Sequence, residues 1–78
     1  MNVRATYDPD IDMAYVYLTE IRAGEISYTE ALVVDLAVGR RLINLDFSRE
    51  GVLLGIEVDG AAATLPAEVL GRADPSAK

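Results

Sequence analysis

The pattern that most constrains the fold lies in residues 46–58, where two runs of alternating side chains flank a short polar loop. The loop ends on Gly51, at the position of a hairpin turn that usually needs a positive φ. The second run carries apolar side chains at every second position, which places them on one face of a strand. These side chains are Val52, Leu54, Ile56 and Val58. Residues 46–58 therefore predict a β-hairpin whose second strand packs one face on a core.

Other segments repeat this two-residue period. They are residues 2–7, 13–18, 25–32 and 41–47. Residues 33–38 are apolar apart from Asp35, and they either continue the third segment or form a strand of their own. In residues 13–18 both faces are partly apolar, which is typical of a sheet that is covered on both sides. We expect a helix on one side and a second subunit on the other.

The C-terminal part of the chain predicts one short helix over residues 64–71. Pro66 suits the first helical position and Gly71 suits the C-terminal cap. The fold expected is α+β, a small antiparallel β-meander of four to six strands with this helix packed on it. Residues 1–71 form the single domain, and residues 72–78 are expected to be a frayed tail.

Composition excludes several chemistries and favours self-association. The 78 residues contain neither cysteine nor histidine, so the chain has no thiolate ligand, no disulfide and no imidazole base. A domain of this size buries only about 60% of the surface that its unfolded chain exposes. Because 51% of the residues are hydrophobic, we expect a homodimer that forms through an apolar sheet face.

The charge balance is acidic, with 13 Asp and Glu against 7 Lys and Arg. Such a surface repels phosphate backbones and anionic lipids, so we expect no nucleic-acid or membrane partner. The first residues lack the apolar stretch of a signal peptide, and a cytoplasmic location is expected.

Three aspartates have the D-x-D-x-D spacing that opens a calcium-binding loop. They are Asp8, Asp10 and Asp12. The sixth position of such a loop is glycine and the twelfth is glutamate, but here they are Met13 and Thr19. We therefore expect an acidic turn, with no metal and no cofactor.

Glu57 follows Gly55 on the same face of the predicted strand, and Asp46 on the preceding strand could face the same side. A close pair of carboxylates would raise one pKa and could serve as acid and base. The alternative is structural, with Glu57 paired to Arg4 or Arg41 or accepting backbone hydrogen bonds at a bulge.

Two motifs resemble those of a known family. Residues 7–16 match Y-D-x-x-x-D-x-x-Y-[IV], and residues 46–58 match D-x-x-x-x-G-x-x-x-G-I-E-[IV]. Together they are similar to small prokaryotic proteins grouped as domain of unknown function family 2283, over residues 3 to about 70. The resemblance implies a small sheet with a C-terminal helix, and it implies no activity.

The function expected is a non-catalytic domain that self-associates or binds another protein. One alternative is a module that binds a small molecule or cation on an acidic sheet face. Another is an enzyme that uses carboxylates alone, although the missing residue types argue against catalysis. The candidate ligand or interaction face comprises Asp8, Asp12, Tyr15, Tyr17, Asp46 and Glu57.

Overall fold

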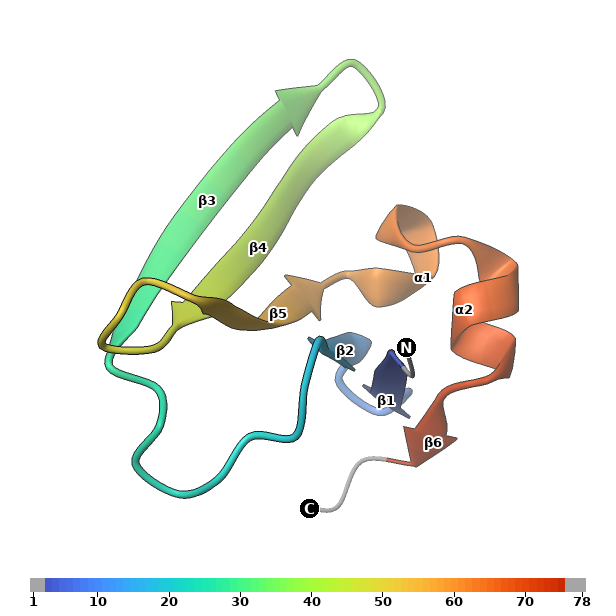
Figure 1. The fold of residues 1–78 in the computed structure, drawn as a ribbon. Coiled ribbons are helices and arrows are strands. Elements are labelled where there is room, and N and C mark those ends of the chain that lie inside the picture. The colour runs from blue at the N-terminus through green and yellow to red at the C-terminus, as the bar shows by residue number, and fades with distance from the viewer. Residues whose placement is uncertain (1–2, 76–78) are drawn as a thin grey trace.

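The alternating segments form a single six-stranded sheet in the computed structural model, which describes residues 3–75 (Figure 1). Two short helices follow the fifth strand. The elements are β1 (Arg4–Asp8), β2 (Met13–Tyr17), β3 (Tyr28–Leu36), β4 (Gly39–Phe47), β5 (Leu53–Asp59), α1 (Ala61–Thr64), α2 (Ala67–Gly71) and β6 (Asp74–Pro75). The fold is therefore α+β, as the sequence predicts.

The strand order is β3-β4-β5-β2-β1-β6, and this order corrects the predicted topology. The chain returns from β4 through β5 to pair with β2, so the sheet is not a simple meander. Four of the pairings are antiparallel, but β6 runs parallel to β1, so the sheet is mixed. Pattern alone could not show this, because alternation specifies a strand's faces and not its neighbours.

The predicted single helix over residues 64–71 is instead two helices, α1 and α2. Leu65 lies between them in an extended conformation, with φ −97° and ψ 149°. Because Leu65 precedes Pro66, the proline ring disfavours a helical conformation there. Pro66 is the N-cap of α2 rather than its first helical residue.

The sheet continues beyond the domain boundary expected at residue 71. Asp74 and Pro75 of β6 pair with Thr6 and Tyr7 of β1. The rest of the expected tail, residues 76–78, lies outside the described residues. At the other side of the sheet, residues 33–36 continue the third predicted strand, which makes β3 nine residues long.

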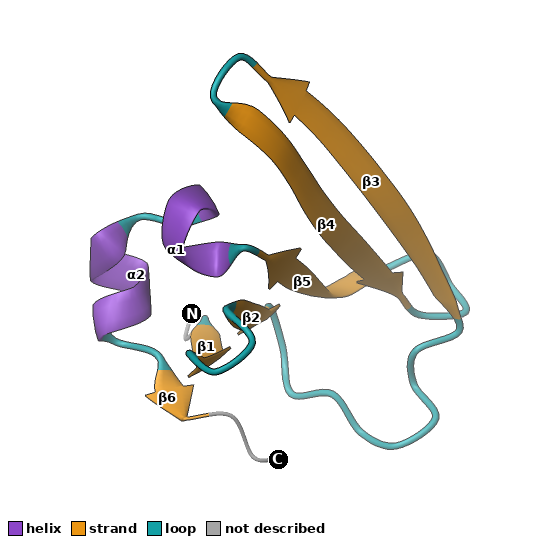
Figure 2. Cartoon of the chain, turned by 180° about the vertical axis from the view of Figure 1, so that it is seen from behind, coloured by secondary structure: helices purple, strands orange, loops and turns teal. Residues whose placement is uncertain are grey.

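The helices cover one face of the sheet near β1 and β5 (Figure 2). The buried apolar side chains there are few and mostly small. They are Ala14, Leu54, Val58 and Ala61. Half-buried side chains complete this layer, namely Tyr7, Ile56, Leu65 and Leu70. The core therefore occupies only the part of the sheet that the helices reach.

On the opposite face, the ring of Tyr15 lies directly against the backbone of β5. A Cβ atom added at Gly55 would lie 2.3 Å from the Tyr15 hydroxyl and 2.6 Å from two carbons of its ring. Carbon atoms in contact are normally about 3.5–4.0 Å apart. Because glycine has no side chain, position 55 leaves the space on the sheet that the Tyr15 ring occupies.

We expect Gly55→Ala to lower the free energy of unfolding by about 3 kcal/mol, because the methyl group forces the Tyr15 ring off the sheet. Urea unfolding measures this change. Gly71→Ala is the matched control, because no heavy atom lies within 4 Å of its added Cβ. Equal stability of the two variants would contradict the contact.

Candidate functional site

Asp46 is the most enclosed charged residue of the described chain, and it joins three strands. Its side chain lies on β4 and the residue is 8% exposed. Tyr15 on β2 donates its hydroxyl hydrogen to Oδ2 at 2.5 Å, and Thr29 on β3 donates to Oδ1 at 2.6 Å. Both carboxylate oxygens are thus occupied by neutral donors. This arrangement stabilises a buried charge, since a buried polar group is costly only when it lacks partners.

The environment of Tyr15 keeps its hydroxyl protonated. Burial raises the pKa of Tyr15 well above its ordinary value of 10, and the hydrogen bond to Asp46 raises it further. A phenol that remains neutral throughout the physiological range acts here as a fixed hydrogen-bond donor. The cluster of Tyr15, Thr29 and Asp46 therefore links three strands through hydrogen bonds, and its geometry does not resemble that of an acid and base pair.

Glu57 has a different partner from those the sequence suggests. Asn44 on β4 donates its side-chain amide to Oε1 of Glu57 at 2.8 Å. Arg4 lies instead over the ring of Tyr17, with 4.2 Å from its guanidinium carbon to the ring centroid. Arg41 donates to the carbonyl of Ala63 at 3.4 Å. Asp46 and Glu57 share a face of the sheet, but the residue opposite Asp46 on β5 is Gly55.

Asp12 attaches the β1–β2 turn to the start of α1. Its Oδ1 accepts hydrogen bonds from the Tyr7 hydroxyl at 2.7 Å and from the Ala62 amide at 2.9 Å. Its carbonyl accepts a third from the Ala61 amide at 3.0 Å. The residue has φ 51°, a left-handed conformation that aspartate and asparagine adopt more readily than other non-glycine residues. These hydrogen bonds lower the pKa of Asp12, with the Tyr7 hydroxyl as the largest cause.

The structure divides the candidate face of the sequence analysis into two separate groups. Asp8 accepts a hydrogen bond from the Asp10 amide at 3.0 Å, which is the expected acidic turn. Within residues 3–75, no hydrogen bond joins Asp8 or Asp12 to Asp46 or Glu57. The described chain also holds no group of three or more potential metal ligands.

The other group surrounds a shallow hollow of about 160 Å³ on the uncovered face of β2. Tyr15, Tyr17 and Glu57 are among its lining residues. Ligand pockets usually measure about 300–1,000 Å³, so this hollow is small for one. The rings of Tyr15 and Tyr17 contact each other edge to face, with centroids 4.7 Å apart. Each tyrosine is half-buried and packs within its own sheet face.

A second hollow, of about 490 Å³, lies between β1 and α2. Its floor is apolar, and its lining includes the charged residues Arg4, Glu68 and Arg72. The sequence analysis missed this feature because its walls come from opposite ends of the chain.

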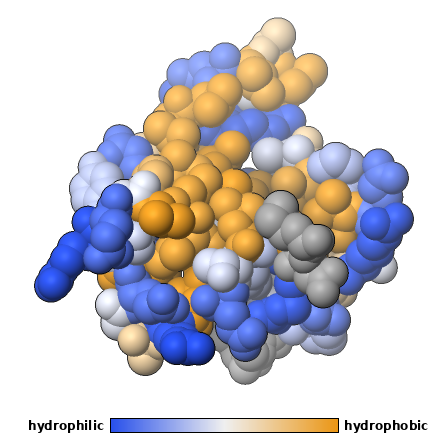
Figure 3. Space-filling view, in the orientation of Figure 1, coloured by the Kyte–Doolittle hydropathy of each residue, from blue (hydrophilic) through white to orange (hydrophobic). Residues whose placement is uncertain are grey.

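Most of the large apolar side chains that are exposed in the described fold lie on β3, on β4 and in the turn between them, and these strands project beyond the helices (Figure 1). We call this area the hairpin surface. It comprises Tyr28, Leu32, Val33, Val34, Leu36, Val38 and Leu42. Apolar atoms extend from the middle of the molecule over this hairpin (Figure 3). The apolar interface expected from the sequence stays a prediction, and the large exposed apolar side chains lie mostly on β3 and β4.

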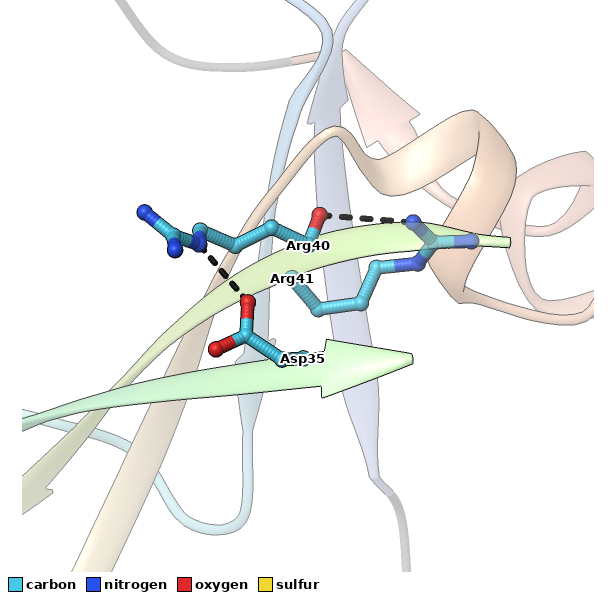
Figure 4. Close-up of polar contacts among 3 residues, drawn as sticks. All are labelled: Asp35, Arg40 and Arg41. Atoms are coloured by element: carbon cyan, nitrogen blue, oxygen red, sulfur yellow. Dashed lines mark hydrogen bonds and ion pairs between the residues drawn. The ribbon is translucent and has the colours of Figure 1, made fainter. Parts of the chain in front are cut away.

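Each charged side chain on the hairpin has a hydrogen-bond or ion-pair partner within the described chain. Arg40 donates its Nε hydrogen to Asp35 at 2.8 Å across the two strands. Figure 4 shows this ion pair, with the Arg41 side chain extending to the other side of β4. Because both partners are well exposed, the pair contributes at most about 1 kcal/mol. Its main effect is to neutralise the carboxylate on the outer strand.

The hydrogen bond from Tyr15 to Asp46 predicts that removal of the Tyr15 hydroxyl destabilises the fold more than removal of the Tyr17 hydroxyl. We expect Tyr15→Phe to lower the free energy of unfolding by about 1.5–3 kcal/mol, because Asp46 loses a hydrogen bond to its charged form. We expect Tyr17→Phe to change it by less than about 0.5 kcal/mol, because no described residue accepts a hydrogen bond from that hydroxyl. Urea unfolding of both variants measures the contrast. A Tyr17→Phe loss as large as that of Tyr15→Phe would mean that the hydroxyl of Tyr15 has no special role.

The Asp12 attachment predicts a pH-dependent stability. The pKa of Asp12 in the folded chain lies below its ordinary value of 3.8. The stabilisation that its carboxylate gives to the fold is therefore fully present above pH 3.8, and it is lost as the pH falls through the folded pKa. Asp12→Asn keeps the left-handed backbone but removes the charge. We expect its melting temperature to lie below that of the natural chain at pH 7, and this gap to shrink at pH 3.

Asp10→Asn serves as the control for that experiment, because Asp10 is exposed and its carboxylate accepts no hydrogen bond from the described residues. Its melting temperature should follow that of the natural chain at both pH values. A gap for Asp12→Asn that is constant with pH would rule out the charge as the source of the effect.

Comparisons with known proteins place the chain in a family. No helix in residues 3–75 is both long and apolar enough to cross a membrane. No curated protein and no solved structure matches the chain. A family model described as "Protein of unknown function (DUF2283)" matches residues 4–61, a range that contains both sequence motifs. The resemblance drawn from the motifs is thereby confirmed, and the chain belongs to the DUF2283 family of proteins of unknown function.

Proposed function

We propose that this protein is a non-catalytic module that self-associates through the hairpin surface and acts as a homodimer. The observation that carries the proposal is the exposure of β3, where eight of the nine residues are exposed and only Glu30 is half-buried. Apolar side chains that remain exposed together on one element of a small protein commonly mark interaction sites. A cytoplasmic location remains part of the proposal and rests on the sequence alone.

The outer part of the hairpin lacks support within one chain. Pairing between β4 and β5 begins at Leu42, which lies opposite Val33 of β3, so residues 34–41 form a two-stranded ribbon beyond the rest of the sheet. Isolated two-stranded ribbons are only marginally stable in water. A partner that covers the ribbon would supply the burial that the small core cannot.

A second copy suits this surface because the hairpin is electrically balanced. Residues 28–42 contain Glu30 and Asp35 against Arg40 and Arg41, a net charge of zero. The whole chain carries −6, so the excess acidic charge lies outside the hairpin. Two copies can therefore approach through their hairpins without the repulsion that their other surfaces would produce.

The residue types in the sequence and the contacts of two aspartates favour a binding function over catalysis. The sequence contains no cysteine or histidine, and the carboxylates of Asp12 and Asp46 are engaged in hydrogen bonds that hold strands and turns. Those contacts leave the two aspartates fewer free lone pairs for a cation or a substrate. The interaction function is for this reason preferred to the acidic binding face and to the carboxylate enzyme.

We expect Val33→Lys to convert the dimer to a monomer, because it places a charge at the middle of the hairpin surface. Light scattering coupled to gel filtration measures the molar mass across a dilution series. The natural chain should give about twice the mass of one 8.4 kDa chain.

Val52→Lys is the matched control. Val52 and Val33 are each 57% exposed, but Val52 lies in the loop before β5 and outside the hairpin surface. It should leave the dimer intact. A natural chain that is monomeric at every concentration would overturn the proposal, and so would a Val33→Lys variant that remains dimeric.

A further inference from the structure

We infer that two copies join edge to edge through β3, antiparallel about a two-fold axis at Leu32, so that the two sheets become one. This inference rests on the proposed self-association and specifies how the hairpins meet. Two-fold contacts bring the same surface of each copy together, which suits a strand that pairs with itself.

The outer edge of β3 is open. Among the strands of residues 3–75, β3 is the terminal one of the sheet and pairs with β4 alone (Figures 1 and 2). Proteins usually protect such edges with lysine, proline, a bulge or a very short strand. β3 has none of these, since its pairing with β4 runs without a register shift from Tyr28 to Leu36. The unpaired amides and carbonyls along this edge provide a template for another strand.

Side chains are exposed on both faces of β3, which favours edge pairing over stacking of one face. Val33 and Val34 point to opposite faces, and they are 57% and 38% exposed. Stacking two sheets would cover one of these valines and leave the other in water. An added strand lies beside both faces and contacts the side chains of each.

The two carboxylates on β3 do not oppose edge pairing. Glu30 accepts a hydrogen bond from the Tyr28 hydroxyl on its own strand. Asp35 is held by Arg40 of β4 (Figure 4). Each negative charge is thus partnered within its own hairpin.

The length of the strand selects the register. An axis at Leu32 pairs all nine residues of β3, with Leu32 opposite its own copy and Glu30 opposite Val34 of the second copy. An axis at Ala31 or Val33 pairs only seven, residues 28–34 or 30–36. An axis at Glu30 would set two glutamates against each other, which is unfavourable. The axis at Leu32 gives the most pairs without a pairing of like charges.

The absence of cysteine from the natural sequence makes the test direct, because one introduced thiol reports only on the partner. We expect Leu32→Cys to form a disulfide-linked dimer under mild oxidation, since residues directly opposite in antiparallel strands have Cβ atoms about 4.5–5.5 Å apart. Val34→Cys is the matched control, on the same face and equally exposed at 38%. In this register the two Val34 positions lie about 13 Å apart along the strands, so its cross-linking should be at least about tenfold slower.

A mixture of two variants checks the register from a second pair. Copies that carry Glu30→Cys should cross-link to copies that carry Val34→Cys, and each should cross-link poorly with itself. Val52→Cys gives the background rate of random collision. Circular dichroism confirms that each variant is folded before the rates are compared.

Spin labels on Val38→Cys provide a distance without a covalent link. With the axis at Leu32, the two hairpin tips point in opposite directions and lie about 40 Å apart along the sheet. Tips closer than about 20 Å would overturn the edge-to-edge arrangement, as would fast cross-linking of Val34→Cys with itself.

The outcomes separate this inference from the proposed function. A dimer by light scattering whose Leu32→Cys variant cross-links only at the Val52→Cys rate would overturn the β3 pairing and leave the dimer standing. A chain that is monomeric in solution would overturn both.

Discussion

Two one-turn helices cover only part of one face of a six-stranded sheet, and this shortage of covering structure determines how the rest of the molecule is held together. The enclosed side chains are few, and within residues 3–75 three of them, Ala14, Val58 and Ala61, form the cluster around which other apolar groups pack. Apolar burial is the main source of stability in most folds, at about 25 cal/mol per Å². A sheet with so little of it depends more heavily on polar contacts between its strands and turns.

Two aspartates supply much of the polar contribution. Asp46 connects β2, β3 and β4 through the hydroxyl groups of Tyr15 and Thr29. Asp12 connects the first hairpin to α1 through Tyr7 and a backbone amide. Each carboxylate accepts hydrogen bonds from groups far apart in the sequence, so it fixes the positions of elements that a larger core would otherwise align. Both sequence motifs thus contain an aspartate with a role in folding.

Local features of the sequence predicted the strands well, because the two-residue period reports directly on the faces of a strand. Leu54, Ile56 and Val58 lie on one face of β5 as the alternation predicts, whereas Val52 lies in the loop before β5 and is exposed. The contacts between strands were harder to predict. Thr29 was overlooked, although the β3–β4 register places it opposite Asp46 and could have suggested the pair. The insertion of β5 between β4 and β2, and the parallel pairing of β6, depend on tertiary packing that no local pattern records.

The two borders of the sheet are built very differently. One ends in the long open strand β3, and the other ends in β6, which has two residues and includes Pro75, a residue without an amide hydrogen. Strand addition at β6 is therefore hindered, while addition at β3 is not. When two copies join through β3, the joint uses the open border of both, and what remains at each end is the proline-blocked border. In the proposed arrangement no open border would remain for a third chain, so pairing through this strand would close at two copies instead of extending into fibres.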